Sequence, residues 1–192
     1  MSQPLVVLIT GVPGTGKTTV SSILANSLGG DHVEITHLVR DGGMSLNWDQ
    51  SRATSIADVK ALRHALSNII AASTKPVVVD GHYSPDVVPR DAATLVVVLR
   101  RAPWVLRAQL QQRGYSPRKI RENVEAELIG TCLVDALESQ DHAKICEIDT
   151  TGQAPEETVK LVLAALDGEA ACGYGSVDWM DAPEAEALLR DL

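Results

Sequence analysis

Short apolar runs alternate with amphipathic segments along most of this chain. Four runs rich in β-branched residues lie at residues 5–10, 77–80, 95–99 and 145–148, each bounded by glycine, proline or polar residues. Residues 33–35 form a shorter fifth run. Runs that are apolar throughout are typical of strands buried on both faces of a sheet. We therefore predict a five-stranded parallel sheet.

The segments between these runs show helical periodicity. Residues 17–28 and 55–72 each place their Val, Leu and Ile side chains on one stripe. Pro103 and Pro117 stand where a first helical position is expected, and Ser116 is a suitable N-cap for a helix that we expect to run to about residue 138. Strands that alternate with helices imply right-handed crossovers, so the prediction is a three-layer α/β/α fold.

Charge is unevenly distributed in this acidic chain. Its 192 residues suit one α/β domain, and a net charge of −8 argues against a general nucleic-acid coat protein. Residues 92–121 nevertheless carry seven basic and no acidic side chains, whereas residues 156–192 carry nine acidic and two basic ones. The basic segment either holds phosphates or is a solvated helix face. We expect a domain at residues 1–167 and an acidic appendage at 168–192.

The cysteines and the N-terminal run point to the cytoplasm. Cys132, Cys146 and Cys172 are odd in number and widely spaced, which favours reduced thiols and no structural zinc site. The apolar run at residues 5–9 is too short to span a bilayer. We therefore expect no signal peptide and no membrane segment.

The strongest motif follows the first predicted strand. Residues 11–18, Gly-Val-Pro-Gly-Thr-Gly-Lys-Thr, fit the phosphate-loop pattern GxxxxGK[ST] and open an amphipathic helix. Glycines let successive backbone N–H groups point at phosphate oxygens, and the helix directs its positive end at the same anion. The alternative is a Gly-rich turn that binds nothing. We assign ATP binding to the loop residues Gly11, Gly14, Thr15, Gly16, Lys17, Thr18 and Thr19.

A phosphate loop requires a carboxylate close to Mg²⁺, and Asp80 ends the buried run 77–80. We assign Mg²⁺ to Thr18 and Asp80, although strands often end in Asp without binding a metal. His82 either orients a water or an acceptor, or is a hydrogen-bonded loop histidine. The other histidines lack metal-ligand spacing, and we expect them to be structural or exposed: His32, His37, His64 and His142.

Two further segments suit phosphoryl transfer. Residues 112–122 join two predicted helices through a glycine turn and concentrate positive charge, which is typical of a short lid. Arg113 is our first choice for contact with nucleotide phosphates, whereas Arg118 and Arg121 either assist or lie on an exposed helix face. Residues 34–57 form a polar insertion where small kinases recognise the acceptor, and Arg40 is the expected partner of an acceptor phosphate.

With these segments in place, residues 5–165 resemble the adenylate kinase isoenzyme 6 family, small adenylate kinases with ATPase activity and a part in small ribosomal subunit assembly. The matching motifs are residues 11–19, 77–82, 97–100, 113–127 and 148–152. The resemblance implies that Asp80 and His82 serve metal binding and hydrolysis and that Arg113 contacts ATP. It further implies that Arg40 faces AMP and that Gln153 and Ala154 pack on adenine. We also assign Arg100, at the end of the third motif, to substrate binding.

The resemblance implies a nucleoside monophosphate kinase fold with a short lid and transfer of the γ-phosphoryl of ATP, with Mg²⁺, to AMP. It also implies ATPase activity and a basic small-subunit ribosomal protein as partner, without sequence-specific nucleic-acid binding. The acceptor region departs from the family at residues 43–49, and Gln109 stands where some members have arginine. The alternatives are an assembly ATPase that acts mainly by binding a ribosomal protein and a kinase for a metabolite such as shikimate or gluconate.

Overall fold

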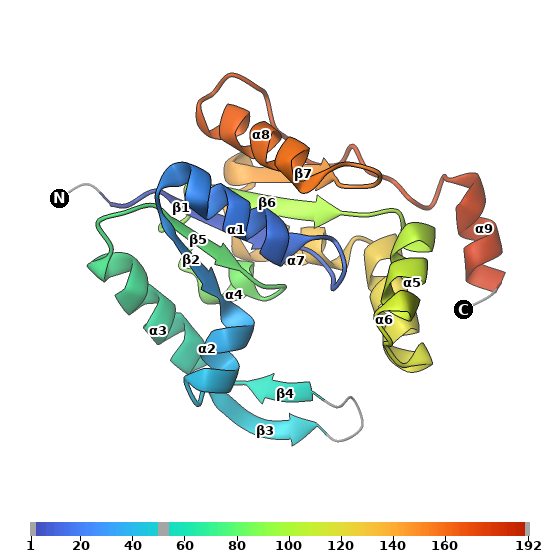
Figure 1. Ribbon diagram of the computed structural model, residues 1–192, viewed down its shortest axis with the longest axis horizontal. Helices are drawn as coiled ribbons and strands as arrows, with labels where there is room; N and C mark the ends of the chain where they lie inside the picture. Colours follow the sequence, from blue (N-terminus) through green and yellow to red (C-terminus); the bar gives the residue numbers. More distant parts are fainter. Residues whose placement is uncertain (1–2, 50–53, 191–192) are drawn as a thin grey trace.

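The computed structural model describes residues 3–49 and 54–190. In chain order the elements are β1 (Val6–Thr10), α1 (Lys17–Leu28), β2 (Asp31–Glu34), α2 (Ile35–Asp41), β3 (Ser45–Asp49), β4 (Thr54–Ala57), α3 (Val59–Ala72), β5 (Val77–Asp80), α4 (Ser84–Val87), β6 (Leu95–Arg100), α5 (Pro103–Gln112), α6 (Pro117–Leu128), α7 (Thr131–Ser139), the 3₁₀ turn η1 (His142–Lys144), β7 (Ile145–Asp149), α8 (Pro155–Leu166) and α9 (Pro183–Arg190). Figure 1 shows their arrangement.

The predicted five-stranded parallel sheet is confirmed, with the order β2-β5-β1-β6-β7. The central strand β1 pairs with β5 through Ile9 and Asp80 and with β6 through Thr10 and Val98. Because the strands are parallel, their carboxyl ends meet at one edge, where α5 and α6 also lie (Figure 1). This edge is where open α/β sheets bind their ligands.

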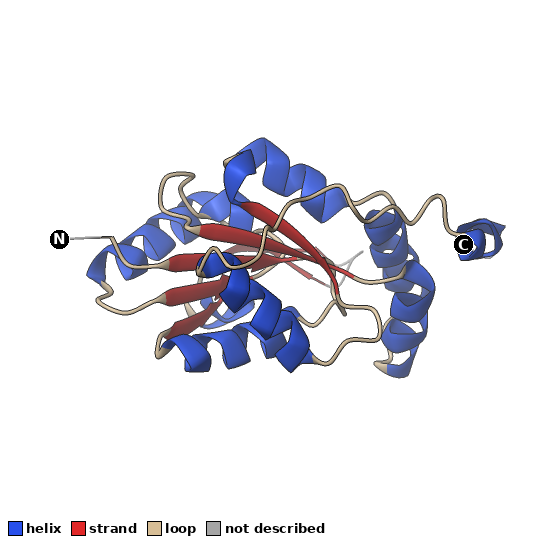
Figure 2. Cartoon of the chain, turned by 90° about the horizontal axis from the view of Figure 1, so that it is seen from above, coloured by secondary structure: helices blue, strands red, loops and turns tan. Residues whose placement is uncertain are grey.

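Helices cover both faces of the sheet, as Figure 2 shows. Successive β1 side chains point to opposite faces, so Val7 and Ile9 pack with α1 and α8 while Leu8 packs with α3 and α7. Each such side chain is fully buried, which is worth roughly 1.5–3 kcal/mol. The α/β/α layering is therefore as predicted. In the described ranges no helix has both the length and the apolar character that crossing a bilayer would require.

Two helix boundaries differ from the prediction. The helix expected from Pro117 to about residue 138 ends at Leu128, and α7 starts separately at Thr131. Between them Gly130 has a φ of +71°, which breaks the helix, and a Cβ at this position would lie 3.5 Å from Arg100 Nη1. The helix expected from residue 55 begins at Val59, because residues 54–57 form β4 and the Asp58 side chain accepts from the N–H groups of Lys60 and Ala61 as an N-cap.

The insertion at residues 34–57 folds as α2 followed by the antiparallel hairpin β3–β4. The hairpin projects from the domain below α2 (Figure 1). Residues 50–53, which belong to the expected acceptor region, lie outside the described residues. The hairpin was not predicted: Ser45–Asp49 alternates polar and apolar residues, but this short pattern lies in a segment that we interpreted only as a polar insertion.

The acidic C-terminal segment returns to the domain over residues 172–190. The Trp179 indole donates to Glu127 Oε1 at 2.9 Å, and its ring lies edge-on to Trp104 with centroids 5.8 Å apart. Helix α9 packs against α5 and buries Ala185 and Leu188. The end of the described chain thus contacts both α5 and α6.

The prediction that all three cysteines are reduced thiols is wrong for one pair. Cys146 in β7 and Cys172 in the C-terminal segment form a disulfide, with Cα atoms 5.1 Å apart, while Cys132 is free and buried. The Glu147 N–H donates to the carbonyl of Gly173, so the returning chain lies beside β7 and brings the sulfur atoms together. A sequence separation of 26 residues gave no local signal of this approach.

Candidate nucleotide-binding site

The loop between β1 and α1 has a rigid, internally bonded shape. Its Thr15 hydroxyl donates to the Val12 carbonyl at 3.0 Å, and the Thr150 hydroxyl of a neighbouring loop donates to the Thr15 carbonyl at 3.1 Å. The Lys17 ammonium also donates to the Val12 carbonyl, at 3.0 Å. Gly16 is the N-cap of α1 and, within the described chain, receives no side-chain cap. The first N–H groups of α1 are therefore available to an anion.

Two loop glycines have a positive φ and lie close to neighbouring elements. Gly11 has a φ of +141°, and a Cβ added there would lie 2.5 Å from the Leu99 carbonyl oxygen. Gly14 has a φ of +101°, and its Cβ would lie 2.6 Å from Leu106 Cδ1. A side chain at Gly11 would displace the loop from the backbone of β6, whereas at Gly14 the Leu106 side chain could yield and the positive φ is the constraint. Gly11 and the buried Thr15 thus determine the conformation of the loop on its buried side.

The loop opens into a cleft of about 290 Å³ at the carboxyl edge of the sheet. The cleft brings together six of the predicted site side chains: Lys17, Thr18, Thr19, Asp80, His82 and Arg113. Glu34, Thr36 and Tyr115 line it as well, together with loop residues. One cleft therefore combines a phosphate loop, cations and carboxylates.

Asp80 is fixed at the bottom of this cleft. It ends β5, is only 2% exposed and has an Oδ2 atom 3.1 Å from His32 Nε2. Parallel pairing puts Glu34, the last residue of β2, directly beside it. Carboxylate and hydroxyl oxygens are the ligands that Mg²⁺ prefers, so Asp80 and Thr18 fit such an ion.

Two basic groups of the cleft, Lys17 and His82, have lowered pKa values. Burial lowers the pKa of the Lys17 ammonium, while the Asp80 carboxylate acts in the opposite direction. The His82 ring keeps an exposed surface, yet surrounding protein partly desolvates it, and this effect, followed by repulsion from Lys17, lowers its pKa to about 4. His82 is therefore neutral at pH 7 and able to accept a proton or orient a water.

The arginine segment divides between two cavities. Arg113, the exposed C-cap of α5, lines the phosphate-loop cleft. Arg118 and Arg121 instead line a neighbouring cavity of about 530 Å³ between α5 and α6, with Arg107. Tyr115 borders both cavities. The structure thus places Arg118 and Arg121, for which we left open a role beside Arg113 or an exposed helix face, in a different cavity from Arg113.

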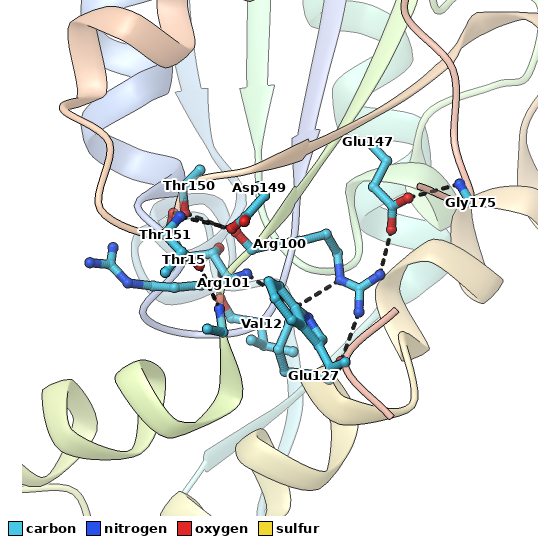
Figure 3. Close-up of polar contacts among 12 residues, drawn as sticks. Val12, Thr15, Arg100, Arg101, Glu127, Glu147, Asp149, Thr150, Thr151 and Gly175 are labelled. Carbon is cyan, nitrogen blue, oxygen red and sulfur yellow. Dashed lines mark hydrogen bonds and ion pairs between the residues drawn. The ribbon is translucent and has the colours of Figure 1, made fainter. Parts of the chain in front are cut away.

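Arg100 does not face the cleft, and its assignment to substrate binding is corrected. It is 3% exposed and bonds Glu127 Oε1 at 2.7 Å, Glu147 Oε1 at 2.5 Å and the Glu127 carbonyl at 2.9 Å. Figure 3 shows its guanidinium between the two carboxylates, with Glu147 also accepting from the Gly175 N–H. Arg100 joins β6, β7 and α6, which explains a buried arginine at a strand end.

The remaining predicted residues lie at the periphery. Arg40, on the last turn of α2, is exposed and forms a bidentate pair with Asp41, at 2.8 and 3.2 Å. Gln153 and Ala154 are exposed in the turn before α8, close to the loop that bonds Thr15. The described cleft contains none of the three, so their roles stay predictions.

Sequence reasoning missed four residues at or beside the cleft: His32, Glu34, Thr36 and Tyr115. His32 and Glu34 alternate along β2, which the sequence placed two residues too late. What brings His32 and Glu34 to the site is the pairing of β2 with β5, and the sequence does not show which strands pair. Tyr115 follows Arg113 in the lid motif but had no assigned role.

The fold is that of the P-loop kinases. Known structures agree on the fold: thymidylate kinase from Candida albicans superposes with a TM-score of 0.61 at 14% identity, covering 88% of this chain and 94% of that enzyme. Shikimate kinase from Aquifex aeolicus gives 0.57 at 18% identity, covering 86% and 98%. At these identities the likeness establishes the fold alone.

Sequence comparisons give the family. A family model described as an AAA domain matches residues 7–130. A "Putative adenylate kinase" of Methanococcus maripaludis is 35% identical over 182 residues, covering 92% of this chain and 96% of the relative. A protein of the same description from Thermococcus kodakarensis is 37% identical over 177 residues, covering 92% and 94%. The chain therefore belongs to this adenylate-kinase-like family of kinases.

Proposed function

We propose that this protein transfers the γ-phosphoryl group of ATP to AMP and so produces two ADP molecules. The observation that carries the proposal is the convergence of Lys17, Asp80 and Arg113 on one cleft beneath an uncapped helix N-terminus. The archaeal relatives named as adenylate kinases support AMP as the acceptor.

Each group has a defined task in this reaction. The loop N–H groups and Lys17 hold the β- and γ-phosphates, and Arg113 neutralises charge that spreads over the transferred group. Thr18 and Asp80 would hold Mg²⁺, which supplies further neutralisation of the donor phosphates when bound. The neutral His82 orients the acceptor oxygen or, without an acceptor, a water, which would give ATP hydrolysis.

The acceptor and the adenine lie at opposite ends of the phosphate loop in this proposal. AMP occupies the side of α2 and the β3–β4 hairpin, where Arg40 would exchange Asp41 for the acceptor phosphate. The ATP base packs near Gln153 and Ala154, since their turn is bonded to the phosphate loop through Thr150. In-line transfer then takes place between two nucleotides whose phosphate groups face each other across the cleft.

A coupled assay of ADP formation tests the proposal, with AMP, CMP, UMP, GMP, shikimate, gluconate or no acceptor. We expect turnover with AMP to exceed turnover with the other acceptors. Lys17→Ala and Asp80→Asn should lower kcat by about 10²–10³-fold, because each removes a charge in contact with the phosphates or the metal. Lys75→Ala, at an exposed lysine before β5, is the matched control. Full activity of Lys17→Ala would refute the site.

A second candidate is an ATP-hydrolysing assembly factor that binds a basic small-subunit ribosomal protein. The observation in its favour is the acidic excess of residues 156–192, with nine acidic and two basic side chains. An acidic surface attracts a basic partner but does not specify one. ATP hydrolysis that AMP fails to stimulate, together with stable binding of such a partner, would favour this candidate over the first.

A further inference from the structure

A histidine outside the cleft lining holds the buried carboxylate of Asp80. The His32 side chain is 22% exposed, and its Nε2 atom lies 3.1 Å from Asp80 Oδ2. An ionised carboxylate only accepts hydrogen bonds, so Nε2 carries the hydrogen and donates it. The contact links the edge strand β2 to β5, in which His32 pairs with Val78 and Glu34 pairs with Asp80.

The hydrogen bond from His32 determines how the Asp80 carboxylate is oriented in the cleft. A carboxylate that is 2% exposed can rotate between conformers unless a partner fixes it, and a bond to Oδ2 fixes the direction of both oxygens. Glu34 stands beside Asp80 at the strand end and lines the same cleft, so its negative charge would otherwise push the Asp80 carboxylate away. Lys17 lines the same cleft and interacts electrostatically with Asp80.

We propose that His32 is a positioning residue that orients the Asp80 carboxylate toward the Mg²⁺ of the bound nucleotide. The inference rests on the proposed function, because it takes Asp80 as a metal-binding residue. Hydrogen-bond partners of metal-binding carboxylates typically contribute 10–100-fold to metal affinity. A purely structural bond would instead hold β2 on β5 and change only the stability of the protein.

The test measures Mn²⁺ affinity by electron paramagnetic resonance in the presence of a non-hydrolysable ATP analogue. His32→Leu should weaken Mn²⁺ binding 10–100-fold, while His32→Gln, which keeps an N–H donor at similar reach, should recover most of the affinity. The affinity for the analogue without metal should change less than about twofold, since the loop N–H groups and Lys17 are untouched. His64→Leu, at an exposed histidine of α3, is the matched control.

A double-mutant cycle with Asp80→Asn makes the proposal falsifiable. If His32 acts through Asp80, His32→Leu should add no further loss of Mn²⁺ affinity in the Asp80→Asn background. An equal loss in both backgrounds would overturn the proposal, as would unchanged Mn²⁺ affinity in a folded His32→Leu protein. Unchanged affinity in Asp80→Asn alone would overturn the proposed metal site together with this inference. Absent AMP phosphorylation with the expected Mn²⁺ affinities would overturn only the proposed function.

Discussion

Replacing Arg100 by Met should remove much of the stability of the domain. Arg100 is 3% exposed and donates three hydrogen bonds, to the carboxylates of Glu127 and Glu147 and to the Glu127 carbonyl. Met preserves most of the side-chain volume but leaves two buried carboxylates without their cation. Breaking a buried ion pair from one side costs about 3–5 kcal/mol, out of a typical total of about 5–15 kcal/mol.

Urea unfolding followed by circular dichroism measures this loss. With a slope of about 2 kcal/mol per molar urea, the midpoint should fall by roughly 2 M at pH 7. Acidification should narrow the difference between variant and wild type. Burial raises the pKa of Glu127 and Arg100 opposes that shift, so the variant has the higher Glu127 pKa. A carboxyl group whose pKa is higher in the folded than in the unfolded protein stabilises the fold at pH values below its unfolded pKa, near 4.5. This stabilisation is lost as the pH rises through the folded pKa.

Two comparisons decide whether this reasoning holds. Arg190→Met removes an arginine that is paired with Glu186 on the exposed surface of α9, and it should cost less than about 0.5 kcal/mol. Neutralising the acids as well, in Arg100→Met with Glu127→Gln and Glu147→Gln, should recover part of the loss. If Arg100→Met unfolds at the wild-type urea concentration, or if its deficit grows at low pH, the buried network does not support the fold.

Two further predictions concern the phosphate loop and the C-terminal segment. Gly11→Ala should cost about 1–3 kcal/mol of stability and weaken ATP binding in calorimetry, because its Cβ would lie 2.5 Å from a carbonyl oxygen. The control is Gly168→Ala, where φ is +72° and nothing lies within 4 Å; it should cost only about 1 kcal/mol and leave ATP binding unchanged. Equal losses in the two variants would contradict the steric argument. Cys172→Ser should lower the free energy of unfolding by about 3 kcal/mol, since the disulfide to Cys146 closes a 26-residue separation. A reductant should shift the urea midpoint of the wild type and leave that of the variant unchanged. An unchanged wild-type midpoint in reductant would contradict the disulfide.

The sequence predicted the parts of the fold that local pattern determines. The run at Val77–Asp80 and the helix at Lys17–Leu28 have the same bounds in the structure, because each has a clear periodicity and is bounded by glycine or proline. Ser116 also caps α6, its side chain accepting from the Lys119 N–H. Local pattern likewise identified the phosphate loop, since its glycines, lysine and flanking elements are contiguous.

Pairing between distant segments explains what the sequence could not predict. Arg100 looked like a phosphate ligand because it ends a strand in a basic segment, but Glu127 and Glu147, 27 and 47 residues away, enclose it. His32 looked structural because no metal-ligand spacing includes it, yet β2 lies next to β5 and brings it to Asp80. In both cases the residue type was visible in the sequence, but its partner on a distant segment was not.

The groups of the cleft differ in mechanical support, and this difference bears on how the site works. Asp80 ends a buried strand and is held by His32, so its position is set before any nucleotide binds. Arg113 caps α5 at the surface, next to Gly114 with a φ of +72°. The exposed Arg113 side chain can change rotamer to meet a phosphate, whereas Asp80 cannot move without breaking β5. We therefore expect ATP to bind to a preformed loop and carboxylate, with closure of the arginine turn as the step that excludes water from the transferred group.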